Sequence, residues 1–96
     1  MAYSGTVVHS YHGTAGTAMD TVNLSVARSS VTITNRGAVD IYVKLPNMGT
    51  AAPTVGGDNT LIVEDGTAKT INSQNEINAV RVIASAASVY SVEAVV

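Results

Sequence analysis

Residues 31–45, VTITNRGAVDIYVKL, contain two runs in which aliphatic side chains alternate with polar ones. The first run alternates with threonines, and the second places four aliphatic residues at every other position from Val39 to Leu45. A period of two puts all the apolar side chains on one face of a strand. Residues 35–37 (NRG) are a turn signal, because glycine readily adopts positive φ. The stretch therefore predicts two strands joined by a turn, which we expect to pair as a β-hairpin.

The same period recurs on both sides of this stretch. It is found in residues 21–26, 61–64, 67–71, 77–83 and 88–96, with breaks at residues 28–30, 72–74 and 84–87. Asp65-Gly66 is a signal for a tight hairpin. We therefore expect an all-β, single-domain antiparallel β-sandwich or jelly-roll-like barrel of about seven to eight short strands.

Residues 1–20 differ from the rest because they are small, polar and glycine-rich, with one short apolar patch at residues 6–8. They predict an extended N-terminal arm, which docks either on a neighbour or on an edge of its own sheet, ahead of a β-sandwich domain at 21–96. A partly disordered terminus is the alternative. Residues 46–59 contain both prolines and three glycines, so they form either a functional loop or a crossover between two sheets.

The composition also predicts association. The chain has 96 residues, 46% of them hydrophobic, yet it has no Phe or Trp and relies on 15 Val, 6 Ile and 13 Ala. Such small side chains bury little area each, so a monomer would be marginally stable, and we expect a homo-oligomer. Charged residues make up only 12% of the chain, and the five Lys and Arg are isolated. That pattern argues against nucleic acid as a partner.

No motif for catalysis or for metal binding is present in the sequence. Cysteine is absent, the carboxylates are scattered, and His9 and His12 have no third ligand close by in sequence. We therefore expect a protein that is not an enzyme and that needs no cofactor or metal. No apolar run reaches the ~20 residues of a membrane helix, and no basic-then-apolar leader begins the chain, so neither a membrane nor a secretion signal is expected.

The tyrosines and the apolar patch of the arm are the candidate interface residues, because tyrosine combines a large ring with a polar tip. The set is Tyr3, Val7, Val8, Tyr11, Tyr42 and Tyr90. Tyr42 should point away from the face that Ile41 and Val43 bury. Partial burial at a sheet edge is the alternative for Tyr42 and Tyr90. Residues 77–83 and 88–96 are apolar on both faces, which predicts a covering layer from the same or another subunit.

The run at residues 31–45 resembles small β-sandwich proteins of tailed-phage virions, together with TLIVEDG at 60–66 and the closing strands within 80–94. The resemblance covers residues 30–96. It implies a head decoration (cement) protein, commonly a trimer, that clamps adjacent major capsid proteins on the capsid surface and is made in the host cytoplasm. A neck or tail adaptor, and a carbohydrate-binding module that uses residues 46–59, are the alternatives.

Overall fold

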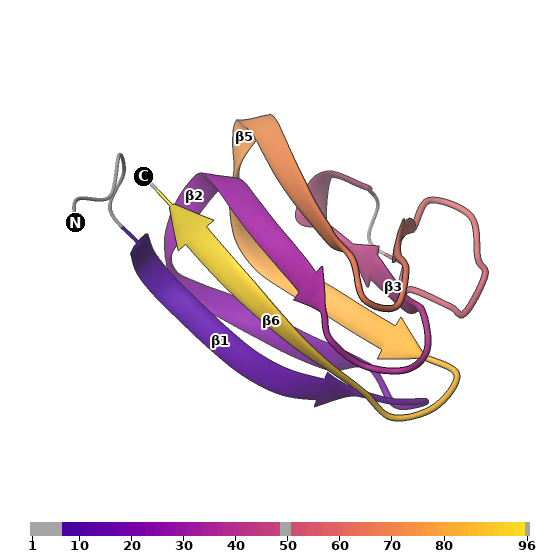
Figure 1. Ribbon diagram of the computed structural model, residues 1–96. Coiled ribbons are helices and arrows are strands. Elements are labelled where there is room, and N and C mark those ends of the chain that lie inside the picture. The colour runs from indigo at the N-terminus through magenta and orange to yellow at the C-terminus, as the bar shows by residue number, and fades with distance from the viewer. Residues whose placement is uncertain (1–6, 49–50, 96) are drawn as a thin grey trace.

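A computed structural model describes residues 7–48 and 51–95, which form six β-strands and one turn of 3-10 helix (Figure 1). Every strand pairing is antiparallel. The elements are β1 (Val7–Ala15), β2 (Asp20–Asn35), β3 (Ile41–Lys44), η1 (Pro46–Met48), β4 (Leu61–Val63), β5 (Ala68–Ala84) and β6 (Ser88–Val95).

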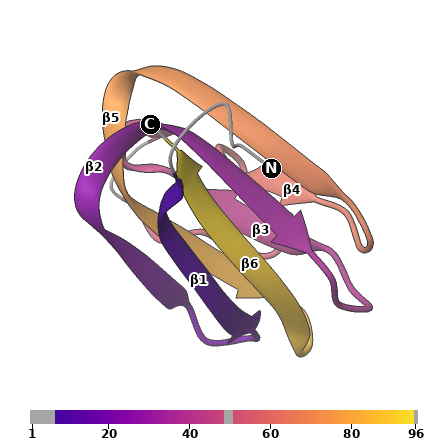
Figure 2. The same ribbon diagram turned by 60° about the vertical axis from the view of Figure 1, so that its left-hand side comes forward.

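The two long strands, β2 and β5, pair with each other along both of their halves. Their register runs from Asp20↔Val82 to Thr34↔Ala68, and it shifts twice between Asn23 and Ser30. On one side of these shifts β5 also pairs with β3, and on the other side β2 also pairs with β6. Both strands bend there and so contribute one half to each of two sheets, which Figure 2 shows from the side.

The result is a β-sandwich of two four-stranded antiparallel sheets. The β6 sheet has the order β1, β6, second half of β2, first half of β5. The β3 sheet has the order first half of β2, second half of β5, β3, β4. If the two halves of β2 and of β5 are counted separately, the chain has eight strand segments. β1 then pairs with β6, the first half of β2 with the second half of β5, the second half of β2 with the first half of β5, and β3 with β4. This nested pairing is that of a jelly roll, and it confirms the expected fold class.

The predicted hairpin at residues 31–45 is wrong, although its two strands are present. The second half of β2 lies in the β6 sheet, whereas β3 lies in the β3 sheet, so the turn between them crosses from one sheet to the other. Asp65-Gly66 likewise joins β4 to the first half of β5 in the opposite sheet. Turn residues allow the chain to reverse but do not determine which strand it pairs with afterwards.

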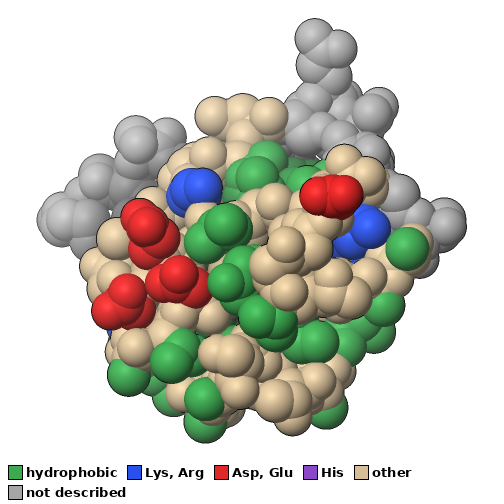
Figure 3. All heavy atoms as spheres, turned by 90° about the vertical axis from the view of Figure 1, so that its right-hand side faces the viewer, with side chains coloured by type: hydrophobic (Ala, Val, Ile, Leu, Met, Phe, Trp, Pro, Cys, Tyr) green, Lys and Arg blue, Asp and Glu red, His purple; other side chains and the backbone are tan. Residues whose placement is uncertain are grey.

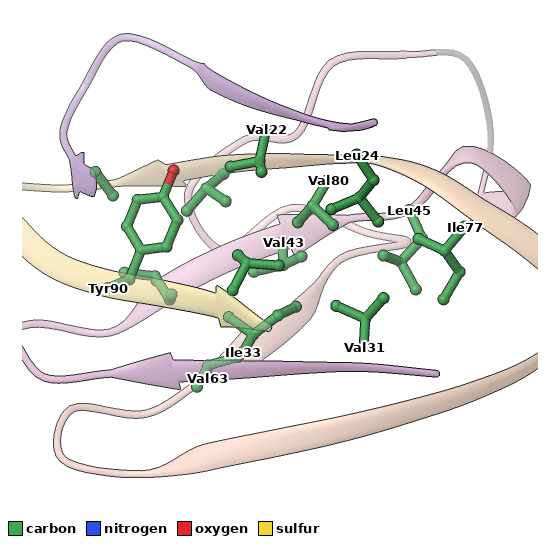
Figure 4. Close-up of a cluster of buried hydrophobic side chains, with 14 of the residues drawn as sticks. Val22, Leu24, Val31, Ile33, Val43, Leu45, Val63, Ile77, Val80 and Tyr90 are labelled. Carbon is green, nitrogen blue, oxygen red and sulfur yellow. The ribbon is translucent and has the colours of Figure 1, made fainter. Parts of the chain in front are cut away.

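The core lies between the two sheets and consists of the inward-facing alternate residues (Figure 4). Val22 and Val80 face inward from the β3 sheet, and Ile33 and Val92 face inward from the β6 sheet. Ile41 and Val43 are fully buried while Tyr42 is half-buried on the opposite face, as predicted. Almost every large buried side chain is β-branched, which suits a pleated surface packed on one side.

The part of residues 1–20 that the structure describes belongs to the sandwich. Val7–Ala15 form β1, which pairs with β6 from Val7↔Val95 to Ala15↔Ser88. Ala15 is fully buried and Tyr11 packs against the core. Of the two docking sites expected for the arm, β1 therefore occupies an edge of its own sheet. Tyr3 lies outside the described residues.

The loop that begins at residue 46 joins β3 to β4, which are neighbours in one sheet. Of the two alternatives for this loop, the crossover between sheets is therefore wrong. It starts with η1 and continues through a turn in which the Gly57 amide donates to Thr54 O at 3.0 Å. Thr60 Oγ1 then donates to Gly57 O at 2.6 Å. Gly56 and Asn59 have positive φ, which these two residue types tolerate.

Candidate functional site

A buried polar cluster lies at the end of the sandwich where the chain crosses between the sheets. The Asn35 side-chain amide donates to Val39 O at 2.8 Å and to Val63 O at 2.9 Å. Its oxygen accepts from the Gly37 amide and from Ser88 Oγ, each at 2.9 Å. Asn35 and Ser88 are both buried, and each of the four bonding positions of the Asn35 side chain has a partner within hydrogen-bonding distance. The cluster holds strand ends together and leaves no group on Asn35 for a ligand.

A second polar cluster joins β1, β2 and β6. Tyr90 OH donates to Asp20 Oδ2 at 2.5 Å, and Tyr11 OH donates to the same oxygen at 3.4 Å. The two rings lie 6.1 Å apart at an angle of 44°. Burial, followed by the hydrogen bond and the negative charge of Asp20, raises the pKa of Tyr90 above its ordinary value. A tyrosine held protonated in this way is a structural hydrogen-bond donor, not an acid or a nucleophile.

The remaining polar contacts offer little chemistry. Arg36 Nη2 lies 3.4 Å from His12 Nδ1, and both side chains are exposed. Among the residues that the structure describes, no group of three or more His, Cys, Asp or Glu is arranged to hold a metal ion. In the same residues, no helix is long and apolar enough to span a bilayer.

The outer face of the β3 sheet carries a row of three apolar side chains on adjacent strands. Tyr42 of β3 stands directly opposite Ile62 of β4 on one side and Ile83 of β5 on the other. Their chain neighbours Ile41, Val63 and Val82 are buried, so the three point away from the core. Tyr42 and Ile83 are half-buried, and Ile62 is 42% exposed. We call these three residues the outer row.

Charged residues flank the outer row on both sides along the strand direction. On one side Lys44 stands opposite Arg81, and Lys44 is only 5% exposed, so the chain itself covers that side. On the other side Asp40 accepts from the Asp65 amide at 3.1 Å. Figure 3, which views the side where the loops around β3 lie, shows acidic side chains gathered next to a band of hydrophobic ones. At the β4 edge the outer row ends with the exposed Ile62, and Asp40 lies two residues before Tyr42 on the same strand side.

The outer face of the β6 sheet is polar, which corrects the expectation that residues 88–96 are apolar on both sides. Val89 is 45% exposed, but Ser91 and Glu93 continue its row, and Thr32 and Thr34 of β2 stand opposite them. Thr32 Oγ1 lies 2.9 Å from Thr70 Oγ1 on the neighbouring strand. On this face the hydroxyl-bearing Thr32 and Thr34 are half-buried and Ser91 is buried, while Thr70 and Glu93 are exposed.

The structure disperses the predicted interface residues. Tyr90 is 0% exposed and belongs to the core, because it shares a face with Val92 and Ala94. Tyr11 is half-buried against that core. Val7 and Val8 lie in β1. Among the predicted interface residues whose side chains the structure describes, Tyr42 alone lies in a row of apolar side chains on an outer face. The neighbours of Tyr42 in that row, Ile62 and Ile83, follow from the strand register. The alternation of apolar and polar residues along one strand does not reveal that register.

Comparison with known proteins gives a fold and no family. No protein-family model matches this chain, and no curated protein matches it. The solved structure of PirA covers 99% of this chain and 100% of its own, with 14% identity and a TM-score of 0.56. A protein of unknown function from Vibrio parahaemolyticus, VPA0057, covers 93% of this chain and 81% of its own, with 13% identity and a TM-score of 0.53. At such identities the likeness extends to the fold alone.

Proposed function

We propose that this chain is a non-enzymatic structural protein of a tailed-phage virion. In this proposal it associates with copies of itself and holds neighbouring major capsid proteins together on the capsid surface. The observation that supports the proposal is the outer row, because an apolar row on the outside of a sheet is typical of a surface that another protein covers. The resemblance of residues 30–96 to head decoration proteins supplies the kind of partner.

The size of the outer row fits a clamp better than a tight single site. Three side chains, two of them half-buried, give a modest contact for each subunit. A symmetric shell repeats such a contact many times, and linked weak contacts gain affinity through effective concentration. The jelly roll occurs in viral capsid proteins and also in lectins, so the fold is compatible with the proposal without selecting it.

Co-sedimentation with capsids tests the proposal. The chain is co-expressed with the major capsid protein encoded on the same genome, and the assembled shells are separated on a density gradient. We expect the chain to sediment with the shells. Ile62→Asp should lower the bound fraction at least tenfold, because a carboxylate would be desolvated in the contact. Free chain at the top of the gradient, with intact shells below it, contradicts capsid binding.

Val89→Asp is the matched control, because Val89 is 45% exposed but lies on the outer face of the other sheet. It should leave the bound fraction unchanged. Sedimentation with neck or tail proteins instead would indicate an adaptor. Retention on a glycan array that is lost in Tyr42→Ala would indicate a carbohydrate-binding module. The resemblance implies a trimer, and the mass of the purified chain by light scattering tests that number.

A further inference from the structure

The free edge of β1 is the feature of this fold that most invites another chain. β1 stands at the end of the β6 sheet, and the residues that the structure describes pair with it on one side only (Figures 1 and 2). From His9 to Ala15 seven consecutive residues pair with β6 without a register shift. The opposite side of this straight segment presents backbone N–H and C=O groups in a row, which is a template for a further strand.

The other three sheet edges are protected in ways that β1 is not. β4 is three residues long and is followed by Glu64 and Asp65. The first half of β5 carries Lys69, and the first half of β2 begins with Asp20. Short strands and charged side chains are the usual means by which proteins prevent edge-to-edge pairing. β1 has nine residues, VVHSYHGTA, without Asp, Glu, Lys, Arg or Pro.

β1 is also held in position for pairing. Tyr11 packs against the core and bonds Asp20, and Ala15 is fully buried. The side chains that alternate with them, Ser10, His12 and Thr14, are exposed on the outer face of the β6 sheet and are small or polar. An incoming strand would therefore meet a rigid edge, with little ordering entropy left to lose.

We propose that β1 pairs with β1 of a second copy of this chain, antiparallel about a two-fold axis, so that two β6 sheets become one continuous sheet. Two-fold pairing places a strand opposite itself, and like charges would then face each other; β1 carries no Asp, Glu, Lys or Arg that could do so. The contact is closed, because it uses the free edge of both copies. Pairing of β1 with the β5 edge of another copy would instead bring in Lys69 and would leave one β1 edge unpaired, so that association would not close.

This inference rests on the self-association proposed above, and it gives a two-fold dimer where the resemblance implies a trimer. The mass of the purified chain distinguishes the two without any capsid. Light scattering across a dilution series should show dimers that dissociate to monomers. The double variant His12→Lys/Thr14→Lys gives each copy two positive charges on the outer face of β1, where the two copies would join. It should weaken dimerisation at least tenfold while the circular dichroism spectrum stays unchanged. Val89→Lys, one strand further in, should dimerise normally.

Single cysteines give a second measurement that does not depend on weakening the contact. The chain has no cysteine, so Ser10→Cys, His12→Cys and Thr14→Cys each introduce one on the exposed face of β1. A two-fold axis through one of these three residues places it opposite its own copy, whereas an axis through Tyr11 or Gly13 places Ser10 opposite His12 or His12 opposite Thr14. Mild oxidation of one single variant, or of an equimolar mixture of two, should therefore yield a disulfide dimer. Val89→Cys should yield none.

Three results would overturn the inference. They are a monomer at every concentration, an oligomer whose mass the lysine pair leaves unchanged, and a cysteine panel that gives no disulfide dimer. A trimer that persists in the His12→Lys/Thr14→Lys variant would show that the copies associate through a surface other than β1. If the chain does not sediment with capsids, the proposed capsid binding is wrong but the β1 contact is not affected. The two proposals are therefore tested by different experiments.

Discussion

Ser88 Oγ lies 2.9 Å from Asn35 Oδ1, so the first residue of the last strand meets a residue 53 positions earlier, at the end of β2. The same hydroxyl lies 2.9 Å from Val39 O, and its single proton serves one of the two oxygens at a time. Through Asn35 the contact extends to Val63 O at the end of β4. Three connections that cross between the sheets are thus joined at one buried point.

Replacing the Asn35 side chain should therefore destabilise the whole sandwich. Asn35→Ala removes the donor to the carbonyls of Val39 and Val63 and the acceptor for the Gly37 amide. Buried groups left without partners cost about 1–3 kcal/mol each, so we expect a loss of about 3 kcal/mol. Urea unfolding followed by circular dichroism measures it as a lower midpoint at an unchanged slope.

Asn23→Ala is the control for that prediction, because Asn23 lies on the same strand but is exposed. Its free energy of unfolding should stay within about 0.5 kcal/mol of the parent value. An equal loss of unfolding free energy in Asn35→Ala and Asn23→Ala would show that the buried hydrogen bonds of Asn35 do not stabilise the fold.

A methyl group at Gly37 should also be poorly tolerated. A Cβ there would lie 1.9 Å from Ser88 Oγ and 2.6 Å from Ser88 Cα, so the backbone of β6 would have to move. Overpacking of this kind typically costs about 1–3 kcal/mol, and the upper value is expected because a main-chain atom is involved. Thermal unfolding of Gly37→Ala measures the loss as a lower Tm.

Gly16→Ala provides the comparison, because no atom lies within 4 Å of a Cβ at that position and its φ is not positive. That change should be neutral or stabilising, since alanine restricts the unfolded chain. If Gly37→Ala melts at the same temperature as Gly16→Ala, then the close approach of the turn to Ser88 does not constrain the fold.

The sequence predicted which face each strand buries but not which strand it pairs with. A period of two is a local property, and it placed Ile41 and Val43 inside and Tyr42 outside. Strand pairing depends on contacts between distant residues, such as β1 with β6, and no local pattern encodes them. The two expected hairpins are wrong for this reason: a turn sequence suits an intersheet crossing as well as a hairpin.

The breaks expected at residues 28–30 and 72–74 have a physical basis of another kind. They lie within the continuous strands β2 and β5, around the register shifts where the two strands bend from one sheet into the other. Loss of the apolar alternation marks the bend, because a strand that leaves one sheet no longer buries a fixed face there. The same period of two places Tyr90 on the face of Val92 and Ala94, which are core residues, so the sequence pattern also indicates a buried position for Tyr90.

Positive φ gives a separate test of the turn that follows β4. Gly66 has a φ of 74°, and a Cβ there would meet no atom within 4 Å, so only backbone strain opposes a side chain. Gly66→Ala should cost about 1–2 kcal/mol. Gly16→Ala again isolates the strain, because it has the same free space without the positive φ. Identical urea midpoints for the two variants would contradict this account of the turn.

The Tyr90–Asp20 hydrogen bond predicts a loss of stability in alkali. Burial and Asp20 raise the pKa of Tyr90 in the folded chain above the unfolded value of about 10. The folded state therefore holds its proton more tightly than the unfolded state does. The resulting stabilisation is fully present below pH 10 and is lost progressively as the pH rises beyond that value. The free energy of unfolding should fall above pH 10.

Tyr90→Phe tests that prediction, because it retains the ring but cannot ionise. At pH 7 the variant should lose about 2 kcal/mol, since a hydrogen bond to a carboxylate is removed and Asp20 Oδ2 keeps only the longer contact with Tyr11. Above pH 10 its stability should fall less steeply than that of the parent chain. Tyr42→Phe changes a half-buried tyrosine on the outer face and should keep the parent slope. If Tyr90→Phe instead loses stability in alkali as steeply as the parent, ionisation of the buried phenol is not what unfolds the chain.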